Sequence, residues 1–160
     1  LNHCFSMEMM GWGFLFLNSQ VEYSSFGRIG DKQLKKIETY LSNNADKPIF
    51  IALHHPSFTV CPVAGCQLED AAIFQELLTK HKIVKVVVAG HTHNDEQNFS
   101  LNYDQYVTPS SFAFATHHQN PSIHREDNFW AGHTLDPSKI GFRWLQLQQS
   151  GAVKSAVIWV

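Results

Sequence analysis

The sequence predicts an α/β fold in which a mixed sheet with helices is followed by β-hairpins. Up to Gly90, apolar segments of strand length alternate with amphipathic segments of helical spacing. After that point the segments become short, alternate between apolar and polar residues, and are separated by turn residues. The length of 160 residues is typical of one domain.

The first strand is predicted at Met10–Ser19, which is apolar and aromatic. Asp31 is the expected N-cap of a first helix over Lys32–Asn43, because apolar residues recur there at helical spacing. A second strand over Pro48–His54 is short and rich in aliphatic residues.

A second helix is predicted over Glu69–His81, and it leads into a third buried strand over Ile83–Ala89. The residues of this helix expected to face inward are Ile73, Leu77 and Leu78. Three short strands should follow, at Gln97–Tyr103, Gln105–Thr108 and Ser111–Thr116.

The end of the chain predicts a hairpin, because Gly141–Leu147 and Ala152–Val160 flank the turn residues Gln149-Ser150-Gly151. The preceding segment, His117–Ser138, is polar, contains two prolines and predicts an irregular excursion.

Composition excludes several classes of protein. The net charge is −2 with neutral histidines, and scattered basic residues give no footprint for a nucleic-acid polymer. No apolar run approaches the roughly 20 residues of a membrane span. The three cysteines, Cys4, Cys61 and Cys66, suggest plain thiols and a cytoplasmic protein, because an odd count without dense spacing is unlike a disulfide scaffold.

Histidine is abundant, with 10 of 160 residues, and two groups of histidines end buried strands. His54-His55-Pro56 follows one strand and Gly90-His91-Thr92-His93 follows another. Ligands bind at the carboxyl ends of strands in open α/β sheets, so neighbouring strands would bring these imidazoles together. Imidazole is a common ligand of Zn, Mn and Fe. The remaining candidates are expected to be ordinary hydrogen-bonded groups, namely His81, His117, His118, His124 and His133.

Two local features refine this metal site. Gly90 permits a sharp backbone change, which would aim His91 and His93 at different atoms of one site. A two-metal hydrolytic centre also needs carboxylates, and the nearby acids lack ligand spacing. Asp95 and Glu96 are interpreted as solvated loop residues.

These motifs resemble a known family. Leu53-His54-His55-Pro56 and then Ala89-Gly90-His91-Thr92-His93, separated by one helix and one strand, resemble the last two motifs of the calcineurin-like metallophosphoesterases. Further segments resemble the bacterial 3′,5′-cyclic AMP phosphodiesterases of that family, and the similarity runs from about Met7 to Val160. These segments are Met7–Trp12, Leu15–Gln20, Thr108–Ser111 and Gly141–Leu145.

The resemblance implies a role for each matching residue. His54 and His91 would bind one metal ion and His93 the other. His55 would lie behind these ligands or face the substrate as a catalytic residue. Ser110 and Ser111 are candidates for contacts with the substrate, although ordinary strand positions are an equally good interpretation.

The resemblance also has a gap. The family's Asp-x-His, Gly-Asp and Gly-Asn-His-Asp motifs are absent, so the chain resembles the carboxyl-terminal half of an α/β/β/α sandwich and forms a single partial domain over residues 1–160. The intact enzyme would hold two divalent ions (Mn, Fe or Zn) and hydrolyse cyclic AMP or another phosphodiester through a metal-bridged hydroxide. This chain would carry at most a partial site and be inactive alone.

The absent half would leave apolar strand surface and a sheet edge uncovered, so we expect self-association or binding of that half. An alternative is a non-catalytic binding or scaffold module of the same fold. The HxHxD motif of metallo-β-lactamase-like hydrolases is a weaker match, because Glu96 stands where that motif has a further histidine.

Overall fold

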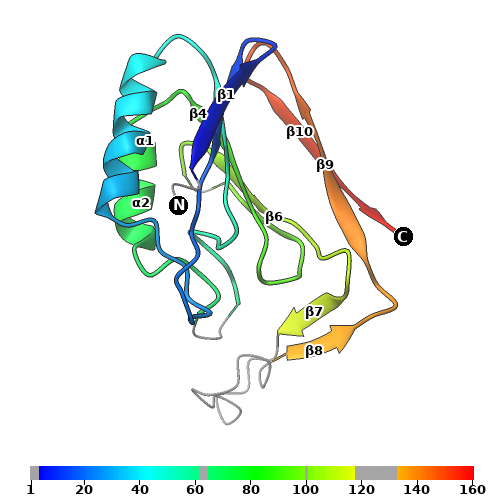
Figure 1. The fold of residues 1–160 in the computed structure, drawn as a ribbon. Coiled ribbons are helices and arrows are strands. Elements are labelled where there is room, and N and C mark those ends of the chain that lie inside the picture. Colours follow the sequence, from blue (N-terminus) through cyan, green and yellow to red (C-terminus); the bar gives the residue numbers. More distant parts are fainter. Residues whose placement is uncertain (1–3, 62–64, 100, 118–132) are drawn as a thin grey trace.

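The computed structural model describes residues 4–61, 65–99, 101–117 and 133–160. Six strands form one sheet in the order β1-β2-β3-β4-β6-β5, and two helices lie together on one of its faces (Figure 1). The helices are α1 (Asp31–Asn43) and α2 (Ala71–Thr79). The strands are β1 (Phe5–Met9), β2 (Trp12–Phe16), β3 (Ile49–Ala52), β4 (Val84–Ala89), β5 (Glu96–Asn98) and β6 (Asp104–Val107).

The sheet is mixed, which confirms the predicted α/β class. Strands β2, β3, β4 and β6 run parallel, while the outer strands β1 and β5 are antiparallel to their neighbours. Helix α1 connects β2 to β3 and helix α2 connects β3 to β4, whereas β4 is connected to its parallel neighbour β6 through β5. The carboxyl ends of β3 and β4 therefore lie side by side.

Two hairpins follow the sheet. The predicted carboxyl-terminal hairpin is confirmed as β9 (Gly141–Leu147) paired with β10 (Val153–Trp159). Strands β7 (Phe114–His117) and β8 (His133–Asp136) pair as well, so the prediction of an irregular segment is wrong at β8. The rest of that segment, with His118 and His124, lies outside the described residues.

Strand β1 was missed by the sequence-based prediction. Met10 and Gly11 both have positive φ angles, 51° and 82°, and form a two-residue turn between β1 and β2. Two-residue hairpin turns usually contain Asn-Gly or Asp-Gly. Met-Gly has the glycine but lacks the preceding Asn or Asp, so the sequence did not indicate a turn here. The predicted strand at Met10–Ser19 is accordingly shortened to β2.

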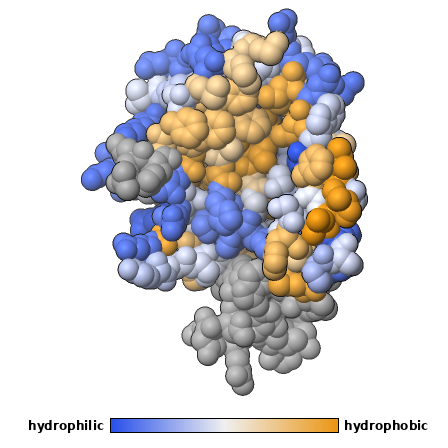
Figure 2. Space-filling model, turned by 45° about the vertical axis from the view of Figure 1, so that its right-hand side comes forward, coloured by the Kyte–Doolittle hydropathy of each residue, from blue (hydrophilic) through white to orange (hydrophobic). Residues whose placement is uncertain are grey.

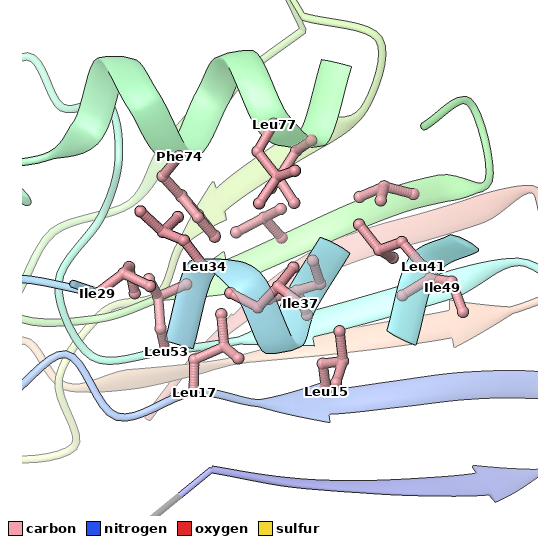
Figure 3. Packing of buried hydrophobic residues seen from close by; sticks show 14 of the residues in the cluster. Leu15, Leu17, Ile29, Leu34, Ile37, Leu41, Ile49, Leu53, Phe74 and Leu77 are labelled. Carbon is pink, nitrogen blue, oxygen red and sulfur yellow. The ribbon is translucent and has the colours of Figure 1, made fainter. Parts of the chain in front are cut away.

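The main core fills the space between the sheet and the helices (Figure 3). The apolar residues that recur at helical spacing in α1 are Leu34, Ile37 and Leu41, and all three are buried. In α2, Leu77 and Leu78 are buried as predicted, together with Phe74. Ile73 is 59% exposed, so its predicted inward position is wrong. The N-cap of α1 is Gly30, and the predicted cap Asp31 is already the first helical residue.

The other face of the sheet is only partly covered. At one end, the buried residues Trp12, Val86 and Tyr106 pack against the β9–β10 hairpin through Leu145, Leu147 and Val153. The indole Nε1 of Trp12 donates a hydrogen bond to the carbonyl of Gln148 (2.9 Å). Figure 2, which brings the side away from the helices forward, shows hydrophobic side chains gathered over a broad area. Neither helix of the described chain has the length and apolar character to cross a bilayer.

Candidate metal centre

Two neighbouring strands bring the predicted metal ligands together. Strands β3 and β4 pair in parallel, and His54 and His91 follow their carboxyl ends by two residues each. The Nε2 atom of His54 lies 3.1 Å from the Nδ1 atom of His91. The structure therefore brings together the two residues that the resemblance assigns to one ion.

The orientation of His91 suits a ligand. Its Nε2 atom lies 3.0 Å from the carbonyl oxygen of Gly65, which can only accept, so Nε2 carries the proton and the lone pair is on Nδ1. A ligating histidine commonly donates its other ring N–H to a backbone carbonyl in this way. Two nitrogens bound tetrahedrally to zinc at about 2.0–2.1 Å are roughly 3.3 Å apart, close to the observed separation from His54.

His55 is the third member of this cluster, with ligand atoms of all three histidines within 4.8 Å of one another. The hydroxyl of Ser19 lies 2.9 Å from Nδ1 of His55. The same hydroxyl accepts a hydrogen bond from the backbone N–H of His55 (3.1 Å). The ring packs so closely on Gly27 that a Cβ atom there would lie 2.2 Å from Cγ of His55. The buried ring lies against His54 and His91, with ring centroids 4.8 Å and 4.3 Å away.

Burial and crowding keep the cluster neutral. The pKa of His55 is lowered to about 4, first by desolvation and then by the charge of His54, and a backbone hydrogen bond with Ser25 opposes the shift. The pKa of His91 is also lowered to about 4, first by desolvation and then by its histidine neighbours. The pKa of His54 is lowered by desolvation and by His93. Neutral imidazole is the form that binds a metal ion.

His93 lies near the cluster but is not one of its three members. The φ angles of His91 and His93 are +71° and +57°. The sharp backbone change therefore falls on the two histidines, whereas the sequence suggested that it falls on Gly90. The carbonyl of His93 accepts a hydrogen bond from the N–H of Ala115 (3.0 Å), and its ring bonds the backbone of Ala113. Desolvation lowers the pKa of this imidazole as well.

Glu96 connects the two histidine-bearing loops. One carboxylate oxygen accepts from the hydroxyl of Thr59 and from the side-chain amide of Asn94, each at 2.7 Å. The other accepts from the backbone N–H of Val60 (3.0 Å). The buried Asn94 also accepts a hydrogen bond from Thr92, inside the motif. The interpretation of Glu96 as a solvated residue is therefore wrong.

Asp95 is also engaged, because it pairs with the buried guanidinium of Arg143 from β9. Arg143 further donates to the carbonyl of Val107 (3.2 Å) and stacks over the ring of Tyr106. Asp95 is an exposed loop residue, as expected, but its ion pair also fixes the hairpin to the loop after the motif. Acids that follow a motif in a turn give no periodic signal, which is why the sequence did not reveal either role.

The sequence suggested strand positions for Ser110 and Ser111. In the structure both lie in the turn that joins β6 to β7. The Ser110 hydroxyl accepts from the N–H of Phe112 (3.0 Å), and the carbonyl of Ser110 accepts from the N–H of Gly141 (3.2 Å). The turn ends at Ala113, whose backbone contacts the His93 ring. These serines therefore lie in the turn that leads to the neighbour of His93.

Cys61 and Cys66 are bonded to each other, so the prediction of plain thiols is wrong for this pair. Gly65, with a φ of +90°, turns the chain back and brings their Cα atoms to 6.2 Å despite the spacing of five residues. Cys4 is the free thiol of the described chain.

The residues present fit one divalent ion better than two. The cluster formed by the described residues consists of His54, His55 and His91, and it contains no carboxylate. Two-metal hydrolytic sites need ligands that hold the ions about 3.5–4 Å apart, usually bridging carboxylates. The histidine triad is therefore a possible partial metal site.

Comparisons with known proteins bear on the family and the fold of the chain. The chain is 33% identical over 161 residues to a probable cyclic nucleotide phosphodiesterase of Psychrobacter sp. (strain PRwf-1), covering 96% of this chain and 43% of the relative. It is 30% identical over 148 residues to the 3′,5′-cyclic adenosine monophosphate phosphodiesterase CpdA of Vibrio vulnificus, covering 91% of this chain and 50% of that enzyme. No protein-family model matches the chain.

Among solved structures, a dimetal phosphatase from Danio rerio superposes with a TM-score of 0.57 at 12% identity, over 98% of this chain and 60% of the phosphatase. GAP50 of Plasmodium superposes with a TM-score of 0.60 at 14% identity, over 98% of this chain and 49% of GAP50. These similarities show the fold alone.

The fold is metallophosphoesterase-like, and it corresponds to part of those structures. Within that class, the chain is homologous to the bacterial cyclic nucleotide phosphodiesterases, and it spans about half the length of the relatives that it matches.

Proposed function

We propose that this chain supplies the histidine side of a metal-dependent phosphodiesterase site whose substrate is a cyclic nucleotide, 3′,5′-cyclic AMP in the first instance. The observation that carries the proposal is the contact between Nε2 of His54 and Nδ1 of His91 at 3.1 Å. Homology to phosphodiesterases over 96% of the chain supports the reaction class, and the name of the Vibrio relative supports the nucleotide.

Each residue of the site has a defined part in this proposal. His54 and His91 present ring nitrogens to one ion, and the carbonyl of Gly65 holds the second nitrogen of His91 protonated. His93 lies beside them and is proposed to bind the second ion. Divalent ions bound at such a centre activate water and neutralise charge on the phosphoryl oxygens.

The surrounding residues position the histidines and the substrate. Ser19 holds the ring of His55 behind the two ligands, where it excludes water and supports their geometry. Ser110 and Ser111 lie in the turn leading to the contact of His93, within the region that a bound nucleotide would face. The chain is proposed to be one partial domain that is inactive by itself, because the histidine cluster has no carboxylate.

The test is hydrolysis of cyclic AMP with added Mn²⁺ by two samples. One contains this chain alone, and the other contains it together with the half of the Vibrio enzyme that the chain does not match, termed here the complementary half. We expect no turnover by either half alone and turnover by the mixture.

The control variants are His91→Ala, which should abolish turnover of the mixture, and His81→Ala, which should not change it because His81 lies away from the cluster. Turnover by this chain alone, or turnover of the mixture that survives His91→Ala, would overturn the proposal.

A further inference from the structure

The backbone carbonyl that orients His91 lies one residue from a disulfide. The Nε2 atom of His91 is 3.0 Å from the carbonyl oxygen of Gly65, and this contact leaves Nδ1 as the nitrogen with a lone pair for a metal ion. Cys66 follows Gly65 directly in the chain and is bonded to Cys61. The partner of a proposed metal ligand is therefore adjacent to a bond that thiols can reduce.

Cys61 is anchored to the segment that carries the second histidine motif. Its backbone N–H donates a hydrogen bond to the hydroxyl of Thr59 (3.0 Å). That hydroxyl donates in turn to the carboxylate of Glu96 (2.7 Å), which lies five positions after His91. The disulfide therefore connects Cys66 to a segment whose position relative to His91 is already fixed.

The chain after the disulfide is anchored to the first histidine-bearing loop. The backbone N–H of Leu68 donates to the carbonyl of Pro56 (3.0 Å), directly after His55. Leu68 also forms an isolated parallel bridge with Gly27, on which the ring of His55 packs. Gly65 thus lies between two segments that are each tied to the histidine cluster, and the disulfide joins one segment to the other.

Breaking this disulfide would disturb the carbonyl of Gly65. Cys61 is only 9% exposed and Cys66 only 1% exposed, so both sulfur atoms lie inside the protein. Once reduced, the sulfurs become nonbonded neighbours, and nonbonded heavy atoms prefer separations of about 3.5–4.0 Å. In a buried place this separation must displace the adjoining backbone. Since hydrogen bonds are lost near about 3.6 Å, a shift of roughly 0.6 Å is enough to break the contact between Gly65 and His91.

We infer that the disulfide between Cys61 and Cys66 is a thiol-sensitive bond that positions His91 for metal binding through the carbonyl of Gly65. Oxidation holds the His91 proton on Nε2, and reduction releases it to either ring nitrogen and weakens the binding of a divalent ion. Both cysteines are positioning residues, because they act through Gly65. The inference rests on the proposed function in taking His91 as a metal ligand.

The reductant is a small thiol, and the exchange balances. Its thiolate bonds to Sγ of Cys61, the more exposed of the two cysteines, and the S–S bond breaks with its electron pair on Sγ of Cys66. A second thiolate attacks the mixed disulfide, forms the small-molecule disulfide and releases Cys61. Each cysteine sulfur takes up the proton that one attacking thiol has lost. Two small thiols are oxidised while one protein disulfide is reduced to two thiols.

The first test needs no metal ion. Nitrogen-15 NMR of the imidazoles, in EDTA at neutral pH, reports which nitrogen of His91 carries the proton, and the signal is assigned by its loss in His91→Ala. We expect the oxidised chain to hold the proton on Nε2. Reduction by a phosphine should lower the ratio of the Nε2–H to the Nδ1–H form at least threefold, and reoxidation should restore it.

The second test measures the affinity for Co²⁺ by its visible absorption. The double variant Cys61→Ala/Cys66→Ala removes the disulfide without leaving a thiol that binds the ion. We expect its Kd to be about 10–100-fold weaker than that of the oxidised wild type, the usual cost of losing an outer-shell partner. The matched control is Cys4→Ser, which removes the free thiol of the described chain and should bind like the wild type. If the double variant does not fold, the NMR of the reduced wild type decides.

Four results would overturn the inference. They are an air-oxidised chain whose peptide map lacks the bond between Cys61 and Cys66, an unchanged His91 tautomer on reduction, equal measurable Co²⁺ affinity with and without the disulfide, and unfolding of the chain on reduction. A tautomer change in a chain that binds no Co²⁺ in either state would refute the proposed function and leave the positioning of His91 standing.

Discussion

The Nε2 atom of His54 lies 3.1 Å from the Nδ1 atom of His91, although 37 positions separate the two residues in sequence. The distance arises because β3 and β4 are parallel neighbours and end at the same edge of the sheet. Both imidazoles have a pKa below the ordinary value, so both are neutral at pH 7. Two neutral ring nitrogens that face each other at this distance form a natural pair of metal ligands.

This pair predicts metal binding by the chain alone. We expect one equivalent of Zn²⁺ or Co²⁺ to bind, and His91→Ala to weaken binding by at least about 100-fold, more than a typical loss of an outer-shell partner. The measurement is calorimetry together with the visible absorption of Co²⁺. His81→Ala is the control, and equal weakening by both variants would show that binding is not at this cluster.

Glu96 should contribute strongly to stability. Glu96→Gln removes a charged acceptor from Thr59, Asn94 and the N–H of Val60, and we expect a loss of about 1–3 kcal/mol in the free energy of unfolding. Urea denaturation provides the measurement. The matched control is Glu76→Gln, since Glu76 pairs with Lys80 at the exposed surface of α2 and should cost about 0.5 kcal/mol or less. Equal losses would contradict the bridging role of Glu96.

Gly27 should be intolerant of a methyl group. A Cβ at Gly27 would lie 2.2 Å from Cγ of the buried His55, so Gly27→Ala should destabilise the chain by about 1–3 kcal/mol and displace the ring. Gly90→Ala is the control, because its Cβ would have Thr108 Oγ1 at 4.0 Å as its nearest neighbour. Thermal denaturation compares the two variants. A Gly27→Ala variant as stable as the wild type would show that the His55 ring does not pack tightly on Gly27.

The metal-free chain should lose stability in acid. The folded-state pKa of His55 is about 4, below the ordinary value of 6.5, so the unfolded chain binds more protons between these values. This contribution is therefore complete above pH 6.5 and is lost as pH falls toward 4. Because one pKa unit corresponds to about 1.4 kcal/mol, the loss in the free energy of unfolding attributable to His55 is on the order of 3 kcal/mol.

Urea denaturation in EDTA at pH 7, 5.5 and 4.5 measures this dependence. His55→Gln should reduce the slope between pH 6.5 and 4 by the share of His55 and leave the share of His91, whose pKa is also about 4. His81→Gln should leave the slope unchanged. A wild-type stability independent of pH over this range would show that His55 is not held neutral by the fold.

The sequence predicted the parts of this protein in which local chemistry and fold agree. Both helices, the strands β3 and β4 and the last hairpin follow from apolar periodicity and turn residues. The histidines at the ends of two buried strands predicted where a site would form, because strand ends in α/β sheets converge.

The sequence was less informative wherever a residue's role depends on a distant partner. The hairpin turn at Met10-Gly11, the bond between Cys61 and Cys66, and the functions of Asp95 and Glu96 all depend on such partners. A loop carboxylate looks solvated in sequence until the fold brings a hydroxyl, an amide or a guanidinium against it.

The sequence by itself therefore determined the α/β class, the order of most elements and the histidines that end β3 and β4. Only the tertiary structure decided which histidines face one another, and it grouped His55 with His54 and His91 while leaving His93 beside them. It also decided that, among the described residues, the hairpin covers only part of the sheet face opposite the helices. The physical reason is that periodicity assigns a side chain to a face of its own element, whereas contacts between elements depend on strand order, on register and on the backbone angles at His91 and His93.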